Sequence, residues 1–315
     1  MYANNLNNKI SPASLTKLMT ALLLYESNSL NKQIKTNLPE DYEYVGKVAY
    51  LDEGLILTTE ELLELLLVYS ANDAAYVAAM EISGNIDAFV NLMNLKAKEI
   101  GMNDTVYKNP DGLDELGHQT TLNDLLKLSI FIIENTKILD ITSKKEIIIN
   151  QLDKVIYNNT NELISEGFDG LKTGWTSEAG LTFIGFNQNN SRIVITIVNK
   201  SSVDADKINH FIDTKTLYEN SINDFSVRNI LYKDDVLYKI FNSESFKNYY
   251  PNRELKSFIR SDIKIEEIVK IENNKLFISY TNIPIEETFY IPASKFKVDY
   301  RFHWSNRFLN NIFNN

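Results

Sequence analysis

Cysteine is absent from this 315-residue sequence, and histidine occurs only three times, as His118, His210 and His303. A chain without cysteine forms neither disulfides nor thiolate metal sites, and it is compatible with an oxidising or a reducing compartment. No two histidines stand in an H-x-x-x-H pair, which disfavours a zinc site built from histidine. We therefore expect no metal ion and no other cofactor.

Other absences exclude further classes of protein. The net charge is −10, so no basic surplus exists to neutralise the phosphates of a nucleic acid. The longest apolar run, residues 62–68, is interrupted by Glu64 and is far shorter than the ~18 residues of a membrane span. The chain also lacks a G-x-S-x-G nucleophile elbow and a glycine-rich phosphate loop.

The composition that remains, 44% hydrophobic and 23% charged residues, is typical of a globular protein. Apolar periodicity predicts helices that flank an antiparallel hairpin, and hence an α+β fold. After about residue 223 the pattern changes to short alternating strands. We expect a large domain over residues 1–222 and a small β-rich domain over 223–315 that ends in a short helix.

Turn and capping residues place these elements along the chain. Thr58 and Glu61 form a capping box for a helix that ends near Tyr69, Thr121 caps another helix, and Gly101 closes the helix before it. The remaining expected helices cover residues 13–24, 87–100 and 205–218, and a further helix follows residues 70–75 and ends at about residue 81. The expected strands are a β-like stretch over 147–156 and a hairpin of 180–186 with 192–198.

The first of these helices carries a pattern of chemical interest, Ser14-x-x-Lys17. Pro12 is suited to start a helix, and residues three apart on a helical turn share a face. A hydroxyl beside an amine, at a helix N-terminus rich in N–H donors, is the arrangement that an acyl-transfer serine requires. The alternative is an amphipathic helix that contains serine and lysine by chance, so the decision depends on later motifs.

Two later segments complete an ordered set. Ser70-x-Asn72 lies at a helix–loop junction, and Lys172-Thr173-Gly174 begins a strand of the hairpin. A strand edge beside a nucleophile offers backbone pairing for an extended substrate, while lysine and threonine suit a carboxylate. Each motif is weak alone, but the three in this order indicate a serine acyl-transfer site.

This set resembles the penicillin-recognising serine enzymes. Within them it is similar to the low-molecular-mass penicillin-binding proteins, the serine D-alanyl-D-alanine carboxypeptidases of peptidoglycan metabolism (peptidase S11 type). The similarity runs from about residue 2 to 220 and is strongest in five segments. These are residues 11–20, 70–75, 109–114 with His118 and Asp124, 161–164, and 169–176.

The resemblance implies a β-lactamase/DD-peptidase-like fold and a role for each catalytic residue. Ser14 would attack the carbonyl of the penultimate D-alanine and form an acyl-enzyme, with Lys17 accepting its proton. Lys17 would then need a lowered pKa, to which Lys172 would contribute. Ser70 would relay a proton to the leaving D-alanine, and Asn72 would hold Lys17 and the substrate amide.

The resemblance also implies the substrate-binding residues, Lys172, Thr173, Gly174 and Trp175. Lys172 and Thr173 would bind the terminal carboxylate, and the N–H groups of Ser14 and Trp175 would form the oxyanion hole. The implied partners are the D-Ala-D-Ala terminus of a peptidoglycan stem peptide and β-lactam antibiotics as inhibitors.

Several other residues are interpreted without a catalytic role. We interpret His118 as a hydrogen-bonding loop residue rather than a base, because Lys17 already fills that role, and Asp111 and Asp114 as turn residues. Trp304, Phe308, Ile312 and Phe313 have helical spacing, which indicates a docked terminal helix or, as the alternative, peripheral contact with a membrane surface.

Two other functions compete with a carboxypeptidase. A β-lactamase needs a deacylating carboxylate, and Glu162 stands only ten residues before Lys172, a poor place for that group. A non-catalytic cell-wall-binding relative is disfavoured because every motif residue is kept.

The resemblance finally implies a location and a longer chain. The substrate lies outside the cytoplasm, so we expect an extracytoplasmic protein, on the outer face of the membrane, in the wall or in the periplasm. Only 13 residues precede Ser14, and no signal peptide is recognisable in residues 1–25. We expect that the first strand of the domain is missing and that the complete protein is ~50–80 residues longer.

Overall fold

The computed structural model describes residues 3–189, 192–203 and 205–231, followed by the segments 238–242, 245–249, 255–262, 269–272, 275–280 and 283–290. Two compact units are distinguished. One comprises Asn4–Tyr218, and the other comprises residues 1–3 together with residues from Glu219 on. The domain boundary that the sequence predicts near residue 222 stays a prediction.

Helices are the main regular secondary structure of the first unit. Its helical elements are η1 Ala13–Thr16, α1 Lys17–Ser27, α2 Thr59–Glu64, η2 Leu65–Tyr69, α3 Asn72–Ser83, α4 Ile86–Glu99, α5 Leu122–Asn135, α6 Ile138–Thr142, η3 Glu162–Glu166 and α7 Asn209–Asp224, which ends beyond the unit. Here η1 and η3 are 3₁₀ turns, and η2 is a π-helical turn that continues α2.

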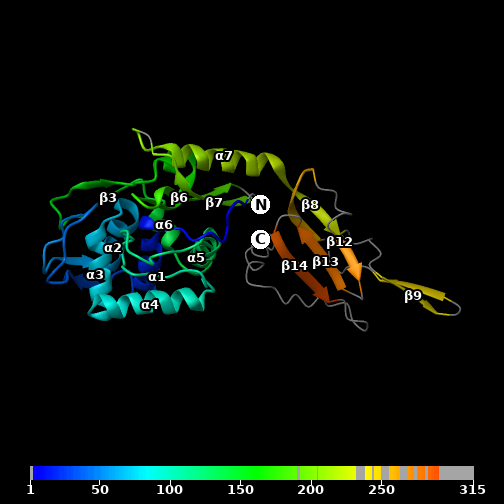
Figure 1. The fold of residues 1–315 in the computed structure, drawn as a ribbon, viewed down its shortest axis with the longest axis horizontal. Helices are drawn as coiled ribbons and strands as arrows, with labels where there is room; N and C mark the ends of the chain where they lie inside the picture. The colour runs from blue at the N-terminus through cyan, green and yellow to red at the C-terminus, as the bar shows by residue number, and fades with distance from the viewer. Residues whose placement is uncertain are drawn as a thin grey trace. The chain divides into compact units, whose positions relative to one another are not determined.

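The sheet of this unit has three antiparallel strands in the order β5–β6–β7. They are β5 Phe168–Thr176, β6 Gly180–Asn189 and β7 Arg192–Ser201. On one face, α7 covers Phe183 and Val198 through Phe211; on the other, Ile184 and Phe186 join the core of the helical region. The sheet therefore lies between α7 and the remaining helices (Figure 1), and the predicted α+β class is confirmed.

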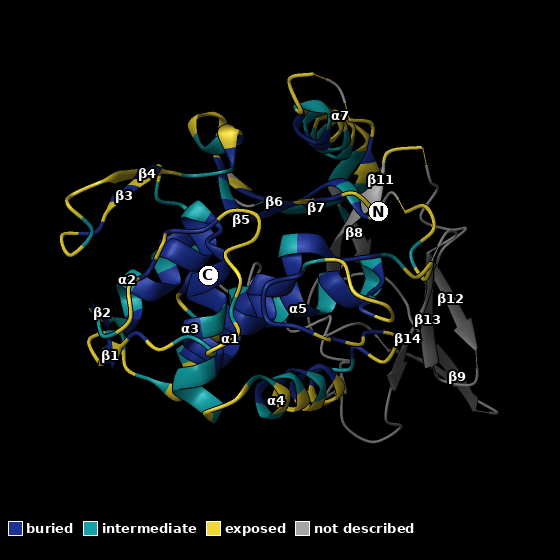
Figure 2. Ribbon diagram, turned by 60° about the vertical axis from the view of Figure 1, so that its left-hand side comes forward, coloured by how far each residue is buried: buried dark blue, intermediate teal, exposed yellow. Residues whose placement is uncertain are grey.

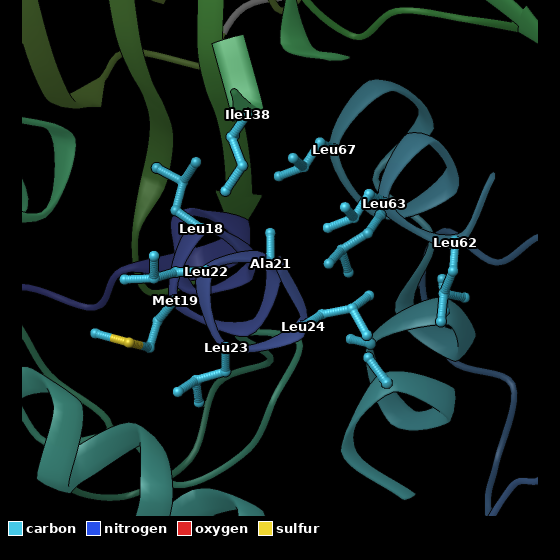
Figure 3. Close-up of a cluster of buried hydrophobic side chains, with 14 of the residues drawn as sticks. Leu18, Met19, Ala21, Leu22, Leu23, Leu24, Leu62, Leu63, Leu67 and Ile138 are labelled. Atoms are coloured by element: carbon cyan, nitrogen blue, oxygen red, sulfur yellow. The ribbon is translucent and has the colours of Figure 1, made fainter. Parts of the chain in front are cut away.

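Helix α1 is the central element of the core. It carries no polar face: its residues from 17 to 24 are all buried, as expected for a helix that is apolar on all sides. Leu63, Leu67 and Ile138 pack around it (Figure 3). Figure 2 shows the contrast with α4, which exposes one flank. Because α1 is enclosed, the residues at its start are held in a fixed position.

The predicted capping residues are confirmed. Thr58 accepts the N–H of Glu61 while the Glu61 carboxylate accepts the N–H of Thr58 at 2.8 Å. Thr121 caps α5 by accepting the N–H of Asp124 at 3.1 Å. Gly101 follows α4 with a φ of +81°, the left-handed conformation that ends many helices.

Four expectations need correction. Residues 147–156 are not one strand: β3 Glu146–Ile148 and β4 Ile156–Asn158 form a hairpin, because Asp153 and Lys154 adopt positive φ in the turn between them. Strand β5 begins before Lys172, at Phe168, because its pairing with β6 extends to Asn187. Helix α7 begins at Asn209 and not at residue 205. Helix α1 begins at Lys17 and not at residue 13.

Short strands pair elsewhere in the described residues. In the first unit, β1 Gln33–Lys35 pairs with β2 Ile56–Thr58. In the second unit, the pairs are β8 Phe225–Leu231 with β11 Leu255–Arg260, β9 Tyr238–Asn242 with β10 Ser245–Tyr249, and β13 Lys275–Tyr280 with both β12 Val269–Glu272 and β14 Ile283–Tyr290.

The second unit accordingly contains the short strands expected of residues 223–315. The terminal helix and the membrane contact considered for Trp304, Phe308, Ile312 and Phe313 lie outside the described residues. Among the described helices, none combines the length and apolarity needed to cross a bilayer.

Candidate active site

Ser14 lies in a tight 3₁₀ turn and not in a regular α-helix. The predicted helix over 13–24 begins as η1, and its α-helical part starts only at Lys17. Ala13 has a φ of +47°, a strained value for a residue with a side chain, so the chain enters this turn sharply. The turn still brings the two groups together: the Lys17 Nζ donates a hydrogen bond to the Ser14 Oγ at 3.0 Å.

The Lys17 amine is fully buried and has three acceptors. Besides Ser14, it donates to the Asn72 Oδ1 and to the backbone carbonyl of Asp111, each at 2.7 Å. Burial lowers the pKa of Lys17 to about 8, against the opposing effect of the Asp111 and Asp73 charges. A substantial fraction of this amine is therefore neutral near physiological pH.

Asn72 joins this amine to the segment before α2. Its Oδ1 accepts from Lys17 while its Nδ2 donates to the carbonyl of Val45 at 2.7 Å, and its own N–H donates to the carbonyl of Lys47 at 2.7 Å. A side chain at Gly46 would lie 2.8 Å from the same Nδ2, so only glycine allows this approach. Asn72 is thus fixed at both ends of its amide.

Ser70 stands at the end of η2, in a left-handed conformation with a φ of +73°. This residue is buried, and its hydroxyl has no hydrogen-bond partner among the described residues. The structure therefore links Ser14, Lys17 and Asn72 directly and leaves the Ser70 hydroxyl outside that hydrogen-bonded group.

Lys172 is a second buried amine, on β5. Its Nζ donates to the carbonyl of Thr173 at 2.9 Å. Burial, followed by repulsion from Lys17 and Lys47, holds the pKa of Lys172 well below its usual value. The electrostatic effect that the sequence led us to expect between Lys17 and Lys172 thus acts on Lys172, whereas the lowered pKa of Lys17 comes from burial.

Thr173 and Gly174 complete the inner part of this strand. The Thr173 Oγ1 donates to the Thr160 Oγ1 at 2.7 Å. A Cβ at Gly174 would lie 3.1 Å from the Ser14 nitrogen and 3.2 Å from the Ala13 Cβ. Glycine thus lets β5 lie directly against the turn that carries Ser14.

Trp175 follows Gly174 on β5 and differs from its neighbours in being exposed. Its side chain is 46% accessible, whereas the other residues of the strand are buried or half-buried. The Lys207 Nζ lies 4.2 Å from the centre of the indole ring. All eight residues singled out in the sequence lie in the first unit, on η1, α1, α3, β5 and the end of η2.

The loop at residues 109–114 contributes contacts that the sequence did not indicate. Besides the bond from Lys17 to Asp111, the Thr20 Oγ1 donates to the Pro110 carbonyl at 2.6 Å. Gly112 has a φ of +91°, and a Cβ there would stand 1.9 Å from the Ala13 carbonyl oxygen. This loop therefore holds both the turn of Ser14 and the first turns of α1, through contacts of long sequence separation.

The interpretations of His118 and Asp111 are confirmed, whereas Asp114, expected to be a turn residue, joins segments that are distant in sequence. His118 is a buried hydrogen-bonding residue: its Nε2 is 3.0 Å from the Thr16 Oγ1, and burial lowers its pKa to about 4, so the imidazole is neutral. Asp111 acts as a turn residue by accepting the N–H of Leu113. Asp114 accepts from the Ser11 hydroxyl and from the N–H of Glu178.

Asp73 is a buried residue whose importance the sequence did not show. Its carboxylate accepts the N–H groups of Ala49 and Leu51, both at about 3 Å, and that of Ala74. It fixes the segment that also carries Val45 and Lys47, the partners of Asn72. Its place in the segment 70–75, at the first turn of α3, is a signal, but that signal does not identify the partners.

Comparison with known proteins places these residues in a family context. A family model described as D-alanyl-D-alanine carboxypeptidase matches residues 1–202. D-alanyl-D-alanine carboxypeptidase DacF of Bacillus subtilis is 36% identical over 187 residues, which are 57% of this chain and 48% of that protein. DacC of Escherichia coli is 28% identical over 65% of this chain and 54% of its own. The chain thus spans about half the length of these curated relatives.

Solved structures are similar as well. Penicillin-binding protein D2 of Listeria monocytogenes, in its cefotaxime-bound form, is 33% identical with a TM-score of 0.60 and covers 69% of this chain and 90% of its own. The carboxypeptidase DacD of Francisella tularensis aligns over 90% of this chain and 86% of its own with a TM-score of 0.73; at 20% identity this match speaks for the fold alone.

Proposed function

Because the chain belongs to the D-alanyl-D-alanine carboxypeptidase family, we propose that it removes the terminal D-alanine from peptidoglycan stem peptides through an acyl-enzyme on Ser14. The observation that carries this proposal is the contact between the Ser14 hydroxyl and the buried Lys17 amine, whose pKa is about 8. A partly neutral amine beside a serine is a general base in position.

In the proposed first step, the Ser14 Oγ attacks the carbonyl carbon of the penultimate D-alanine as its proton passes to the Lys17 amine. A C–O bond forms, the C–N bond to the terminal D-alanine breaks, and Ser70 relays the proton to the departing amine. Water then cleaves the ester and restores the Ser14 hydroxyl. Asn72 keeps Lys17 in place, as its 2.7 Å bond indicates.

The proposed binding site for the substrate is the strand beside the nucleophile. Lys172 and Thr173 bind the terminal carboxylate, and Gly174 brings β5 close enough for the N–H groups of Ser14 and Trp175 to form an oxyanion hole. The approach of Gly174 to the Ser14 nitrogen supports this arrangement. Since the peptidoglycan substrate lies outside the cytoplasm, we place the protein there too, whatever the extent of its complete chain.

A β-lactam would acylate the same serine, and a structural relative binds cefotaxime. Efficient release of that adduct, as in a β-lactamase, needs a carboxylate near Ser14. Glu162 does not meet this need, because its side chain is exposed at the start of η3 and makes no hydrogen bond to a described residue of the site. We therefore propose inhibition by β-lactams rather than their turnover.

Intact-mass analysis after treatment with penicillin tests the proposal. We expect one added penicillin on the wild type, none on Ser14→Ala, and one on Ser29→Ala, which changes an exposed serine just after α1. Release of D-alanine from an acetylated peptide ending in D-Ala-D-Ala follows the same pattern. A folded wild-type protein that neither gains the adduct nor releases D-alanine contradicts the proposal.

A further inference from the structure

The exposed indole of Trp175 and the ammonium of Lys207 form a pair at the edge of the site. Trp175 directly follows Gly174, whose backbone lies against the turn of Ser14. Lys207 comes from a distant part of the sequence, two residues before α7, and places its Nζ 4.2 Å from the ring centre. A cation over an aromatic face is held there by the charge distribution of the ring.

Lys207 has no carboxylate partner among the described residues, and its side chain is exposed. The lysines that form ion pairs in the described part of the chain, such as Lys96 and Lys144, are neutralised by nearby glutamates. An ammonium that is positioned by a ring, and not by an anion, keeps its capacity for a charge-assisted bond to an incoming carboxylate.

The proposed function determines how a substrate peptide is oriented beside Trp175 and Lys207. The inference therefore rests on that proposed function. A terminal carboxylate at Thr173 and a scissile carbonyl at the N–H of Trp175 orient an extended peptide along β5. Each residue of such a peptide advances about 3.3 Å. The scissile carbonyl belongs to the penultimate D-alanine, so that residue lies opposite Trp175. The residue before it lies one position further along β5, at the edge where Trp175 and Lys207 stand.

We propose that Trp175 and Lys207 form a specificity subsite for the residue that precedes D-Ala-D-Ala. The indole supplies an apolar surface for the aliphatic part of that side chain. Lys207 favours a carboxylate over an ammonium at the end of the same side chain. The subsite thus discriminates among stem peptides by the charge at their third residue from the end.

Three acetylated tripeptides test this directly: acetyl-Glu-D-Ala-D-Ala, acetyl-Gln-D-Ala-D-Ala and acetyl-Lys-D-Ala-D-Ala. We expect the wild-type kcat/KM to fall in that order. In Lys207→Gln, the ratio of the Glu to the Gln peptide decreases by up to about fivefold, the range for an exposed ion pair. In Lys207→Glu, the order of the Glu and Lys peptides reverses. The Gln peptide normalises each variant for changes in folding or acylation.

Lys98→Gln is the matched control, because it removes the same charge from an exposed position on α4. Its Glu-to-Gln ratio equals that of the wild type. If Lys207 had only a structural role, Lys207→Gln would change kcat/KM for all three peptides by the same factor. An unchanged Glu-to-Gln ratio in Lys207→Gln therefore contradicts the subsite but leaves the proposed function unaffected. A wild type that gains no penicillin adduct and cleaves none of the peptides contradicts the proposed function, and this inference with it.

Discussion

The proposed reaction requires opposite charge states of two buried amines, those of Lys17 and Lys172. In the proposed mechanism Lys17 acts as a base in its neutral form, whereas Lys172 binds a carboxylate best as a cation. Burial disfavours the charged form of both in the free protein, and lowers the pKa of each. The arrival of an anion at Lys172 supplies the counter-charge that the free site lacks, so binding and protonation of Lys172 are coupled.

Replacing Lys17 with alanine tests its role as the base. We expect Lys17→Ala to slow acylation by penicillin about 10²–10⁴-fold, the usual contribution of a general base. Lys98→Ala, at the exposed position on α4, keeps the wild-type rate. The measurement is the rate of adduct formation on protein whose thermal unfolding is first compared with that of the wild type. An unchanged rate in Lys17→Ala assigns the base elsewhere.

The pH dependence of acylation has a predicted sign. In the proposed mechanism the reactive form of Lys17 is the unprotonated amine, and its pKa is about 8. Acylation by penicillin is therefore slow at about pH 6 and increases toward about pH 8. Rapid-mixing rates from about pH 6 to about pH 9.5 check this profile. A rate that is highest at the acidic end would require the protonated amine and would exclude Lys17 as the base.

Lys172→Ala separates carboxylate binding from proton transfer. A charge-assisted hydrogen bond contributes roughly 1.5–3 kcal/mol, so a peptide with a free terminal carboxylate loses about 10- to 100-fold in kcat/KM. The matching peptide amide has no such bond to lose and changes far less. Equal losses for acid and amide mean that Lys172 acts through the fold or the proton chemistry.

The loop at 109–114 packs against the turn of Ser14, where Gly112 approaches the Ala13 carbonyl. Gly112→Ala combines left-handed strain, about 1–2 kcal/mol, with a Cβ only 1.9 Å from the Ala13 carbonyl oxygen. We expect a larger loss of stability than from strain alone, together with a slower acylation by penicillin.

Gly84→Ala is the control for this substitution. Gly84, at the end of α3, has a similar φ of +71°, but nothing lies within 4 Å of the position that a Cβ would take there. This variant should lose only the strain energy in urea unfolding and keep the acylation rate of the wild type. If the two variants lose equal stability and react equally fast, the loop does not position the turn.

Local signals in the sequence account for much of this fold. The capping box of Thr58 and Glu61 and the caps at Gly101 and Thr121 depend on neighbours within a few residues, so the pattern predicts them. The contact of Lys17 with Ser14 is local in the same way. Its partner Asn72 was accessible only through the resemblance to a family.

Contacts of long sequence separation account for what the sequence missed. Pro12 and the apolar run predict a regular helix, but the approach of Gly112 and Gly174 to the turn favours a 3₁₀ geometry around Ser14. The hydrogen bonds that the N–H groups of Ala49 and Leu51 donate to Asp73 likewise join segments more than twenty residues apart. No periodicity or propensity encodes such pairings.

For the whole molecule, every residue of the candidate site belongs to the unit Asn4–Tyr218. We expect a fragment of residues 1–224, which keeps all of α7, to fold and to form the penicillin adduct at the rate of the full chain. Circular dichroism and intact mass check the two parts of this prediction. A folded but unreactive fragment means that residues beyond 224 contribute to catalysis.

The bond from Lys17 to the Asp111 carbonyl joins positions 94 residues apart, and Ser14 meets Gly174 across a still longer stretch of chain. Closing such loops is entropically costly, and contacts of this kind form late in folding. Helical signal should therefore return early during refolding, while the ability to react with penicillin returns only with the last long-range contacts. A β-lactam added at intervals would then measure the fraction of molecules that have reached the native state, since we expect it to label only molecules in which these distant segments are in contact.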